Sequence, residues 1–230
     1  GVYIGKIANT HLLMTSAHVI KNKKTQKLIN CKRELAVIIN DKRAICERVI
    51  SHQKNNDLVI IEIRYLEEDI ESSEHSPLIF KTSFQKEELL LNIGYSSHKS
   101  NLQGMTYNND EYCRVFSNEI KALNVEENDV WSIAIGCDSS PGNSGSAIVN
   151  RDSGNVLGFI WGVGQNKEKE LKNNLFIEHL NISTDESVWK YLTYATPSLK
   201  IYEKLVEDLK ANAFPDSDII VIEELLNQFI

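Results

Sequence analysis

Short apolar runs separated by polar turns follow one another along most of this chain, and this pattern restricts the fold more than any other feature. Many of the runs are rich in valine and isoleucine, which favour β-strands. The expected strands span residues 2–6, 12–15, 35–39, 44–50, 58–63, 89–93, 105–107, 112–117, 130–136, 146–149, 156–162, 175–177 and 191–195. Such a series of short strands is typical of small β-barrels. The sequence therefore predicts an all-β architecture up to residue 196.

The spacing of apolar residues changes after residue 196. From Pro197 onwards they recur at helical intervals, and a second helical run follows Pro215. The two runs predict helices over residues 197–209 and 218–229. The apolar face of the first helix is expected to contain Leu199, Tyr202, Leu205, Val206 and Leu209.

An acidic stretch at residues 67–74 has the composition of an exposed connection between two halves of the chain. It separates the first five expected strands from the others. We therefore expect a first β-barrel over residues 1–75, a second over residues 76–196, and a helical extension over residues 197–230.

Residues 142–146 form a glycine-flanked turn around a serine, Ser144, and an apolar strand-like run follows it. Small residues on both sides let the backbone turn sharply and leave a hydroxyl and neighbouring amides facing outward. That arrangement suits a nucleophile beside an oxyanion hole. Clusters of this composition also mark ordinary turns, so the motif gains weight only from what lies upstream.

Two upstream segments supply the partners that a serine nucleophile needs. His18 follows an apolar run, and Asp57 stands directly before a buried strand rich in β-branched residues. Taken alone, each residue is more typical of a structural position in a loop or turn. Together with Ser144 they give the order His, Asp, Ser. Acyl transfer requires a hydroxyl, a base that activates it and a carboxylate that orients the base.

The segments around these residues resemble the signature blocks of a known family. Thr-Ser-Ala-His at 15–18, Asn-Asp-Leu-Val-Ile at 56–60 and Pro-Gly-Asn-Ser-Gly-Ser at 141–146 look like those of chymotrypsin-fold serine peptidases. The likeness is closest to bacterial glutamyl endopeptidases and HtrA-type peptidase domains. It implies two six-stranded-type antiparallel β-barrels followed by helices, and a trypsin-like endopeptidase that cuts polypeptides.

The resemblance also implies a role for each residue of the triad. Ser144 is then the nucleophile, His18 the general base, and Asp57 the carboxylate that orients the imidazole. The amides of Gly142 and Ser144 are implied to form the oxyanion hole.

By the same resemblance, Asp138, Ile160 and Thr193 wall the primary specificity pocket, and Trp161 and Gly162 border the substrate cleft. Asp138 lies six residues before Ser144, where trypsin-like enzymes carry the aspartate that binds arginine or lysine. Glutamate-specific relatives have a histidine where Ile160 stands, which argues against acidic specificity. The expected residue before the scissile bond is basic, or small to medium and uncharged. Trp161 also fits the role of an ordinary core aromatic.

The composition excludes some partners and leaves others open. A net charge of −7 and a pI near 5.4 argue against nucleic acid. No apolar run approaches the length of a membrane span, and no signal peptide opens the chain, which slightly favours an intracellular location. The implied chemistry needs no cofactor, and no cluster has metal-ligand spacing. Because Gly1 already resembles part of the first barrel's second strand, an upstream or downstream segment or a partner chain is expected to complete that barrel.

Four cysteines allow three pairings: Cys31, Cys46, Cys113 and Cys137. If the first barrel ends at residue 75, the first two and the last two each form a pair within one barrel. Four buried thiols in a reducing compartment fit the sequence equally well.

Two alternatives to an active peptidase follow from the same residues. One is a catalytically latent peptidase-fold module that binds or regulates other proteins as a domain of a larger one. The other is a hydrolase of the α/β class, which is disfavoured because those enzymes have the triad order Ser, Asp, His and alternate strands with helices.

Overall fold

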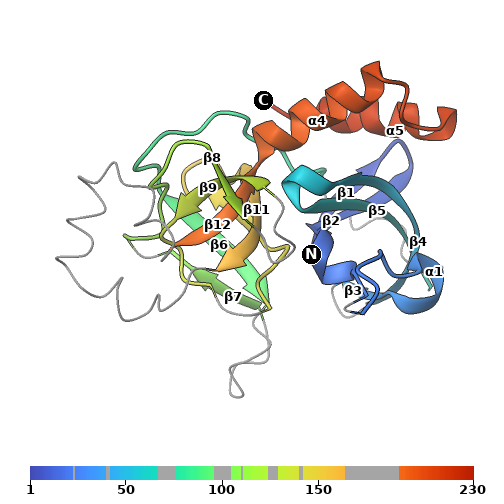
Figure 1. Ribbon diagram of the computed structural model, residues 1–230, viewed down its shortest axis with the longest axis horizontal. Coiled ribbons are helices and arrows are strands. Elements are labelled where there is room, and N and C mark those ends of the chain that lie inside the picture. The colour runs from blue at the N-terminus through green and yellow to red at the C-terminus, as the bar shows by residue number, and fades with distance from the viewer. Residues whose placement is uncertain are drawn as a thin grey trace.

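The structure is a computed structural model, and it describes residues 1–22, 24–39, 42–66, 76–95, 105–109, 111–123, 129–139, 142–163 and 192–230. In these residues it has two antiparallel β-sheets and two long helices near the C-terminus (Figure 1). The expected all-β, chymotrypsin-like fold with C-terminal helices is confirmed. None of the helices in the described residues is both long and apolar enough to cross a membrane.

The first sheet contains five strands in the order β1-β2-β5-β4-β3. Their bounds are β1 Val2–Ile7, β2 Thr10–Ser16, β3 Ala36–Ile39, β4 Lys42–Gln53 and β5 Leu58–Tyr65. Both faces of β5 are buried, with Leu58 and Ile60 in one hydrophobic core and Val59 and Ile61 in another. A strand covered on both sides needs apolar residues at successive positions, which explains the uninterrupted apolar run from residue 58.

The second sheet contains seven strands in the order β7-β6-β10-β11-β12-β9-β8. Their bounds are β6 Leu90–Tyr95, β7 Met105–Asn108, β8 Ile120–Leu123, β9 Asp129–Ile135, β10 Ala147–Asn150, β11 Val156–Val163 and β12 Thr193–Pro197. The sequence did not predict β8, or the short helix α1 (Cys31–Glu34) of the first half. The expected strand at 112–117 makes isolated β-bridges instead.

A central hydrophobic core joins the two sheets to the helices. It contains Met14 and Ile60 from the first sheet, Phe159 from the second, and Ile201 and Leu205 from helix α4 (Ser198–Lys210). The buried face of α4 is centred on Ile201 and Leu205, so it is rotated slightly from the expected face. Figure 1 shows α4 leaving the second sheet and extending over the first, with α5 beside it.

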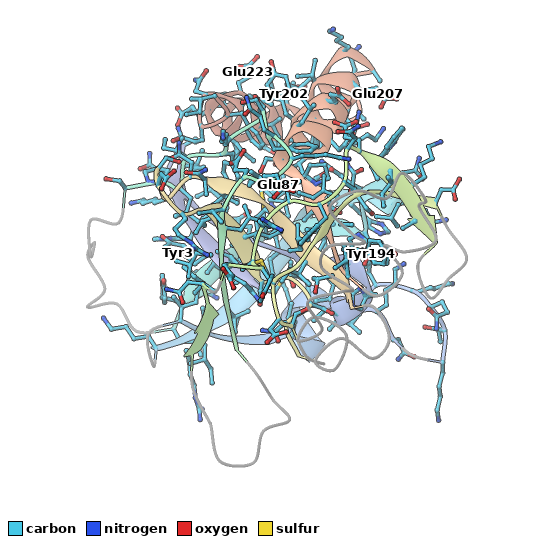
Figure 2. The ribbon with its side chains drawn as sticks, turned by 90° about the vertical axis from the view of Figure 1, so that its left-hand side faces the viewer. Tyr3, Glu87, Tyr194, Tyr202, Glu207 and Glu223 are labelled. Atoms are coloured by element: carbon cyan, nitrogen blue, oxygen red, sulfur yellow. A yellow bond between two sulfur atoms is a disulfide. The ribbon has the colours of Figure 1, made fainter. Side chains whose placement is uncertain are left out.

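Helix α5 (Asp216–Leu226) begins just after Pro215 and ends three residues earlier than the sequence pattern predicts. The residues after it turn back to the segment that leads into the second sheet. Phe229 stacks on Phe80 with ring centroids 4.6 Å apart, and Phe80 N–H donates to the Gln228 carbonyl at 2.8 Å. Figure 2 labels Tyr202 and Glu207 of α4 and Glu223 of α5 in this helical layer.

The structure pairs Cys31 with Cys46 and Cys113 with Cys137, so each disulfide lies within one sheet region. Of the two alternatives for the cysteines, disulfides or buried thiols, the structure therefore has the disulfides. The acidic stretch at 67–74 and the expected strand at 175–177 lie outside the described residues.

Candidate active site

The pairing of strands β2 and β5 brings His18 and Asp57 together. Ser16, the last residue of β2, lies opposite Leu58, the first residue of β5. His18 lies two positions after Ser16, in a 3₁₀ turn, η1 (Ala17–Ile20), and Asp57 lies one position before Leu58, directly after another such turn, η2 (Lys54–Asn56). Ala17 N–H donates to the Asp57 carbonyl at 2.8 Å. The register thus explains how two residues separated by 39 positions become neighbours.

Two hydrogen bonds join the Asp57 carboxylate to His18. The backbone N–H of His18 donates to Oδ1 at 3.0 Å, and ring Nδ1 lies 2.5 Å from Oδ2. The Asp57 side chain is 1% exposed and that of His18 is 27% exposed. With the carboxylate ionised, Nδ1 must carry the proton, which leaves Nε2 as the atom able to accept one.

The turn that contains Ser144 depends on its glycines. Gly142 has φ of 105° and Gly145 has φ of 81°, values that favour glycine over any other residue. Gly145 also packs against the strand that leads to His18: a Cβ there would collide with Thr15 Oγ1 and would lie 3.0 Å from Ser16 N. The second glycine is therefore required by both backbone conformation and space.

One carbonyl links the serine turn to the histidine segment. The Ile160 carbonyl accepts from Gly145 N–H at 2.6 Å and from the Ser16 hydroxyl at 2.8 Å. Ser144 directly precedes Gly145, and His18 follows Ser16 by two positions. The shared carbonyl therefore brings the segments of both candidate residues together. Within the described residues, no hydrogen bond joins the half-buried Ser144 to His18.

Within the described residues, some backbone amides of the serine turn donate to a carbonyl acceptor, and others do not. Gly145 N–H and Ser146 N–H donate to the carbonyls of Ile160 and Asn143. In the part of the chain that the structure describes, the amides of Gly142 and Ser144 have no such acceptor. These are the two amides that the family resemblance implies for an oxyanion hole.

Of the expected pocket residues, Thr193 contacts both chain neighbours of Asp138, which are Cys137 and Ser139. The Asp138 side chain is exposed, and its carbonyl accepts from Asn92 Nδ2 at 3.0 Å. The next residue, Ser139, places its hydroxyl 2.6 Å from that of Thr193, which donates to the Cys137 carbonyl at 2.9 Å. Ser139 was not among the expected site residues, and only its place beside Asp138 could have suggested it.

The expected cleft residues occupy the strand β11. The side chain of Ile160 is fully buried in the core of the second sheet, and its carbonyl makes the link described above. Trp161 is 8% exposed, and its indole donates to the Ser132 hydroxyl at 3.0 Å. The indole stacks on Tyr194, with ring centroids 5.5 Å apart; Figure 2 labels Tyr194. Gly162 lies opposite Tyr194, where the register between β11 and β12 shifts.

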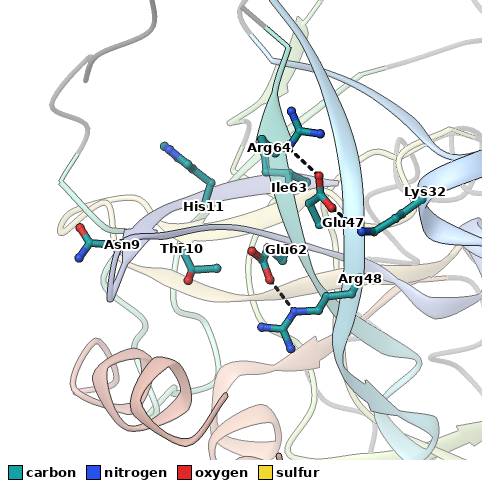
Figure 3. Close-up of a pocket in the computed structure, with 9 residues that line it drawn as sticks. All are labelled: Asn9, Thr10, His11, Lys32, Glu47, Arg48, Glu62, Ile63 and Arg64. Carbon is teal, nitrogen blue, oxygen red and sulfur yellow. Dashed lines mark hydrogen bonds and ion pairs between the residues drawn. The ribbon is translucent and has the colours of Figure 1, made fainter. Parts of the chain in front are cut away.

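Two surface cavities have no triad candidate in their lining. One, of about 560 Å³, is on the first sheet, where Glu47 pairs with both Lys32 and Arg64, and Glu62 pairs with Arg48 (Figure 3). Its charges are thus paired with one another. The other, of about 350 Å³, is bordered by residues 52–56 and by helix α4. Neither cavity is lined by Ser144 or Asp138.

Two antiparallel sheets, with a hydrogen-bonded His–Asp pair beside one and a glycine-flanked serine beside the other, are the arrangement expected of a chymotrypsin-fold serine peptidase. The model of the trypsin-like peptidase domain matches residues 1–159, and the chain belongs to this family of serine endopeptidases. Polypeptides are the substrates that this membership implies. No curated protein sequence matches the chain.

Solved peptidase structures share the fold. The active form of the Rv3671c protease from M. tuberculosis matches with TM-score 0.54 and 17% identity, over 85% of this chain and 68% of that one. The HtrA-type protease AlgW with a tripeptide gives TM-score 0.53 and 15% identity, over 88% of this chain and 53% of AlgW. The chain thus spans about half the length of AlgW. At these identities the likeness shows the fold alone.

Proposed function

We propose that this protein hydrolyses peptide bonds through a triad of His18, Asp57 and Ser144. The observation that carries the proposal is the 2.5 Å contact between His18 Nδ1 and a buried Asp57 carboxylate oxygen, next to the serine turn. A buried carboxylate on one ring nitrogen fixes the tautomer that leaves the other nitrogen basic.

The reaction follows from these positions. His18 Nε2 accepts the Ser144 hydroxyl proton while Ser144 Oγ bonds to the carbonyl carbon of the substrate, and the carbonyl π electrons move onto oxygen. The tetrahedral intermediate collapses, the C–N bond breaks, and His18 returns the proton to the leaving amine. Water then attacks the acyl-enzyme by the same route and releases the acid. Throughout, Asp57 holds the imidazole and stabilises its charged form.

The amides of Gly142 and Ser144 would bind the oxyanion. This assignment is supported because neither amide has an acceptor within the described residues, whereas the amides of Gly145 and Ser146 do. A donor aimed at a developing oxyanion contributes about 10²–10³ in rate.

The hydrogen bonds of the Ser139 and Thr193 hydroxyls favour a basic residue before the scissile bond over an uncharged one. A hydroxyl has one proton, and Thr193 gives its own to the Cys137 carbonyl, so Ser139 must be the donor in the 2.6 Å contact with Thr193. The Ser139 oxygen then has only lone pairs for a substrate. Lone pairs beside the exposed Asp138 carboxylate suit the donor groups of lysine or arginine.

Labelling with a fluorophosphonate probe tests the triad. The wild type is expected to react, whereas Ser144→Ala and His18→Ala lose the reaction. Ser153→Ala is the matched control, because it removes an exposed serine of the same half and should label like the wild type. Equal labelling of the wild type and Ser144→Ala would refute the assignment. A folded wild type that does not label would favour the latent binding module instead.

Peptide-library profiling of Asp138→Ser and Ser139→Ala tests the specificity. Loss of cleavage after lysine and arginine in Asp138→Ser, with a smaller loss in Ser139→Ala, is the expected result. A profile that Asp138→Ser leaves unchanged, or one dominated by small uncharged residues in the wild type, would reject a basic pocket.

A further inference from the structure

Asp57 has a backbone conformation that its surroundings must maintain. Its φ and ψ are 44° and 41°, in the left-handed region. For a residue other than glycine this conformation costs about 1–2 kcal/mol. Such conformations persist only where neighbouring structure holds them, and they occur disproportionately at active sites. The question is which groups hold this one.

The bonds of Asp57 itself run to the first half of the chain. Its carboxylate accepts from His18, its carbonyl accepts from Ala17 N–H, and its own N–H donates to the Lys54 carbonyl at 3.2 Å. These contacts fix Asp57 relative to the 3₁₀ turn η2 and to His18. They do not fix η2 itself.

The second half of the chain holds η2 through Asn56, which precedes Asp57. Asn56 Nδ2 donates to the Lys200 carbonyl at 2.9 Å and to Gln53 Oε1 at 2.8 Å. The Asn56 carbonyl accepts from the Thr196 hydroxyl at 2.6 Å. Asn56, Gln53 and Thr196 are each at most 4% exposed. Buried hydrogen bonds of this kind are costly to break, because the remaining polar group cannot turn to water.

The first turn of α4, which receives the Asn56 amide, is itself anchored to the second sheet region. Lys200 Nζ lies 3.0 Å from a Glu119 carboxylate oxygen, 2.8 Å from one of Glu203, and 4.6 Å from the centroid of the Trp131 ring. Burial lowers the pKa of Lys200, but its hydrogen bonds to Glu203 and Glu119 outweigh burial and raise the pKa overall. The ammonium group therefore stays charged and in place.

We infer that Asn56 and Thr196 are positioning residues for Asp57, so that β12 and α4 of the second half set the orientation of the carboxylate beside the first sheet. This inference rests on the proposed function. It assigns to the C-terminal helix a role in catalysis that its distance in sequence from the triad does not suggest.

The test compares Thr196→Val with Ser198→Ala. Both remove a buried hydroxyl, from positions two residues apart in the chain, but Ser198 donates to the Val156 carbonyl at 3.1 Å and not to η2. Thr196→Val is expected to lower kcat about 10-fold, and Asn56→Ala about 100-fold, with KM within about 2-fold of the wild type. Ser198→Ala should leave both close to the wild type. Thr196→Ser, which keeps the hydroxyl, should restore most of kcat.

A background of Asp57→Asn separates positioning from general destabilisation. If Asn56 acts through Asp57, Asn56→Ala lowers kcat about 100-fold in the wild type but causes little further loss in Asp57→Asn. Equal fold losses in the two backgrounds would overturn the inference. So would a Thr196→Val variant whose kcat matches that of Ser198→Ala.

Proton NMR of the His18 Nδ1–H resonance gives a readout that needs no activity. A short hydrogen bond to Asp57 is expected to give a low-field signal in the wild type and in Ser198→Ala, and the signal should shift or vanish in Thr196→Val and Asn56→Ala. An unchanged signal would refute positioning even if Ser144 proved inactive. Conversely, if the wild type reacts with the probe but the variants do not differ in kcat as expected, the positioning role is overturned and the proposed function stands.

Discussion

The two sides of the candidate site are built differently. On the acid–base side, Asp57 is buried and hydrogen-bonded to His18 through both carboxylate oxygens. On the nucleophile side, Ser144 is half-buried in a turn whose Gly142 and Ser144 amides have no acceptor within the described residues. On the first side the protein satisfies both oxygens of the carboxylate, whereas the second leaves two amide donors without an acceptor in the described part of the chain.

Under the proposed function, this difference separates groups that orient from groups that react. An orienting carboxylate works best when its geometry is fixed before the substrate arrives, whereas a nucleophile and an oxyanion hole must leave their atoms open for the substrate. The difference predicts that damage to each side has its own signature. Mutations on the acid–base side should act on rate, and mutations in the serine turn should act on rate and stability together.

The largest effect is expected when His18 or Ser144 is removed, one from each side of the site. His18→Ala and Ser144→Ala should each lower kcat by about 10⁶-fold, and the double variant should lose little more, because the groups act as a unit. Single-turnover hydrolysis of a fluorogenic peptide measures this. If the two losses multiplied in the double variant, the residues would not belong to one catalytic unit.

The next effect concerns the glycine at the contact between the two sides. Gly145→Ala should destabilise the protein by about 3 kcal/mol and lower kcat, because the new Cβ meets Thr15 Oγ1 and the Ser16 backbone in addition to the left-handed strain. Gly154→Ala is the matched control: its φ is 72°, but no atom lies within 4 Å of the added Cβ. It should lose only about 1 kcal/mol. Urea unfolding measures both, and equal losses would contradict the packing argument.

The two disulfides sharpen the comparison further. Replacing either pair by serine should cost about 3 kcal/mol, since each closes a loop of 15 or 24 residues. Only the Cys113–Cys137 pair directly precedes Asp138 and Ser139, so only its loss should also alter the cleavage profile. Thermal unfolding and peptide profiling of the two double variants would show this. A changed profile in the Cys31–Cys46 variant alone would oppose it.

The smallest effect is a loss of stability in alkali. Burial, followed by the nearby Tyr65, raises the pKa of Tyr3 to about 12. The folded state thus favours the neutral phenol, so its contribution is complete below pH 10 and is lost as the pH rises toward 12. Tyr3→Phe should reduce this alkaline loss by about 1–2 kcal/mol after allowance for solvent screening. Urea midpoints at pH 8 and pH 11.5 measure it. An unchanged pH dependence would show that Tyr3 does not contribute.

The class of fold could be predicted from the sequence because the spacing of apolar residues within each short segment indicates a strand or a helix. The apolar run after Asp57 becomes β5, and the change of period at Pro197 becomes α4. The sequence pattern missed the four-residue strand β8, which pairs with β9, the next strand along the chain. It also extended α5 through Phe229, because the structure of that residue depends on a distant partner. Phe229 is apolar enough to continue a helix, yet stacking on Phe80 draws it into an extended segment.

By itself, the sequence determined the residue types that a serine peptidase needs and the glycines that the serine turn requires. Only the tertiary structure decided how they meet, because strand register places Asp57 beside His18 and one Ile160 carbonyl joins the serine turn to the histidine segment. It also decided the role of Asn56, which in the sequence is one of two adjacent asparagines in a turn. Its partners Thr196 and Lys200 lie about 140 residues away, and no local pattern records a contact over that distance.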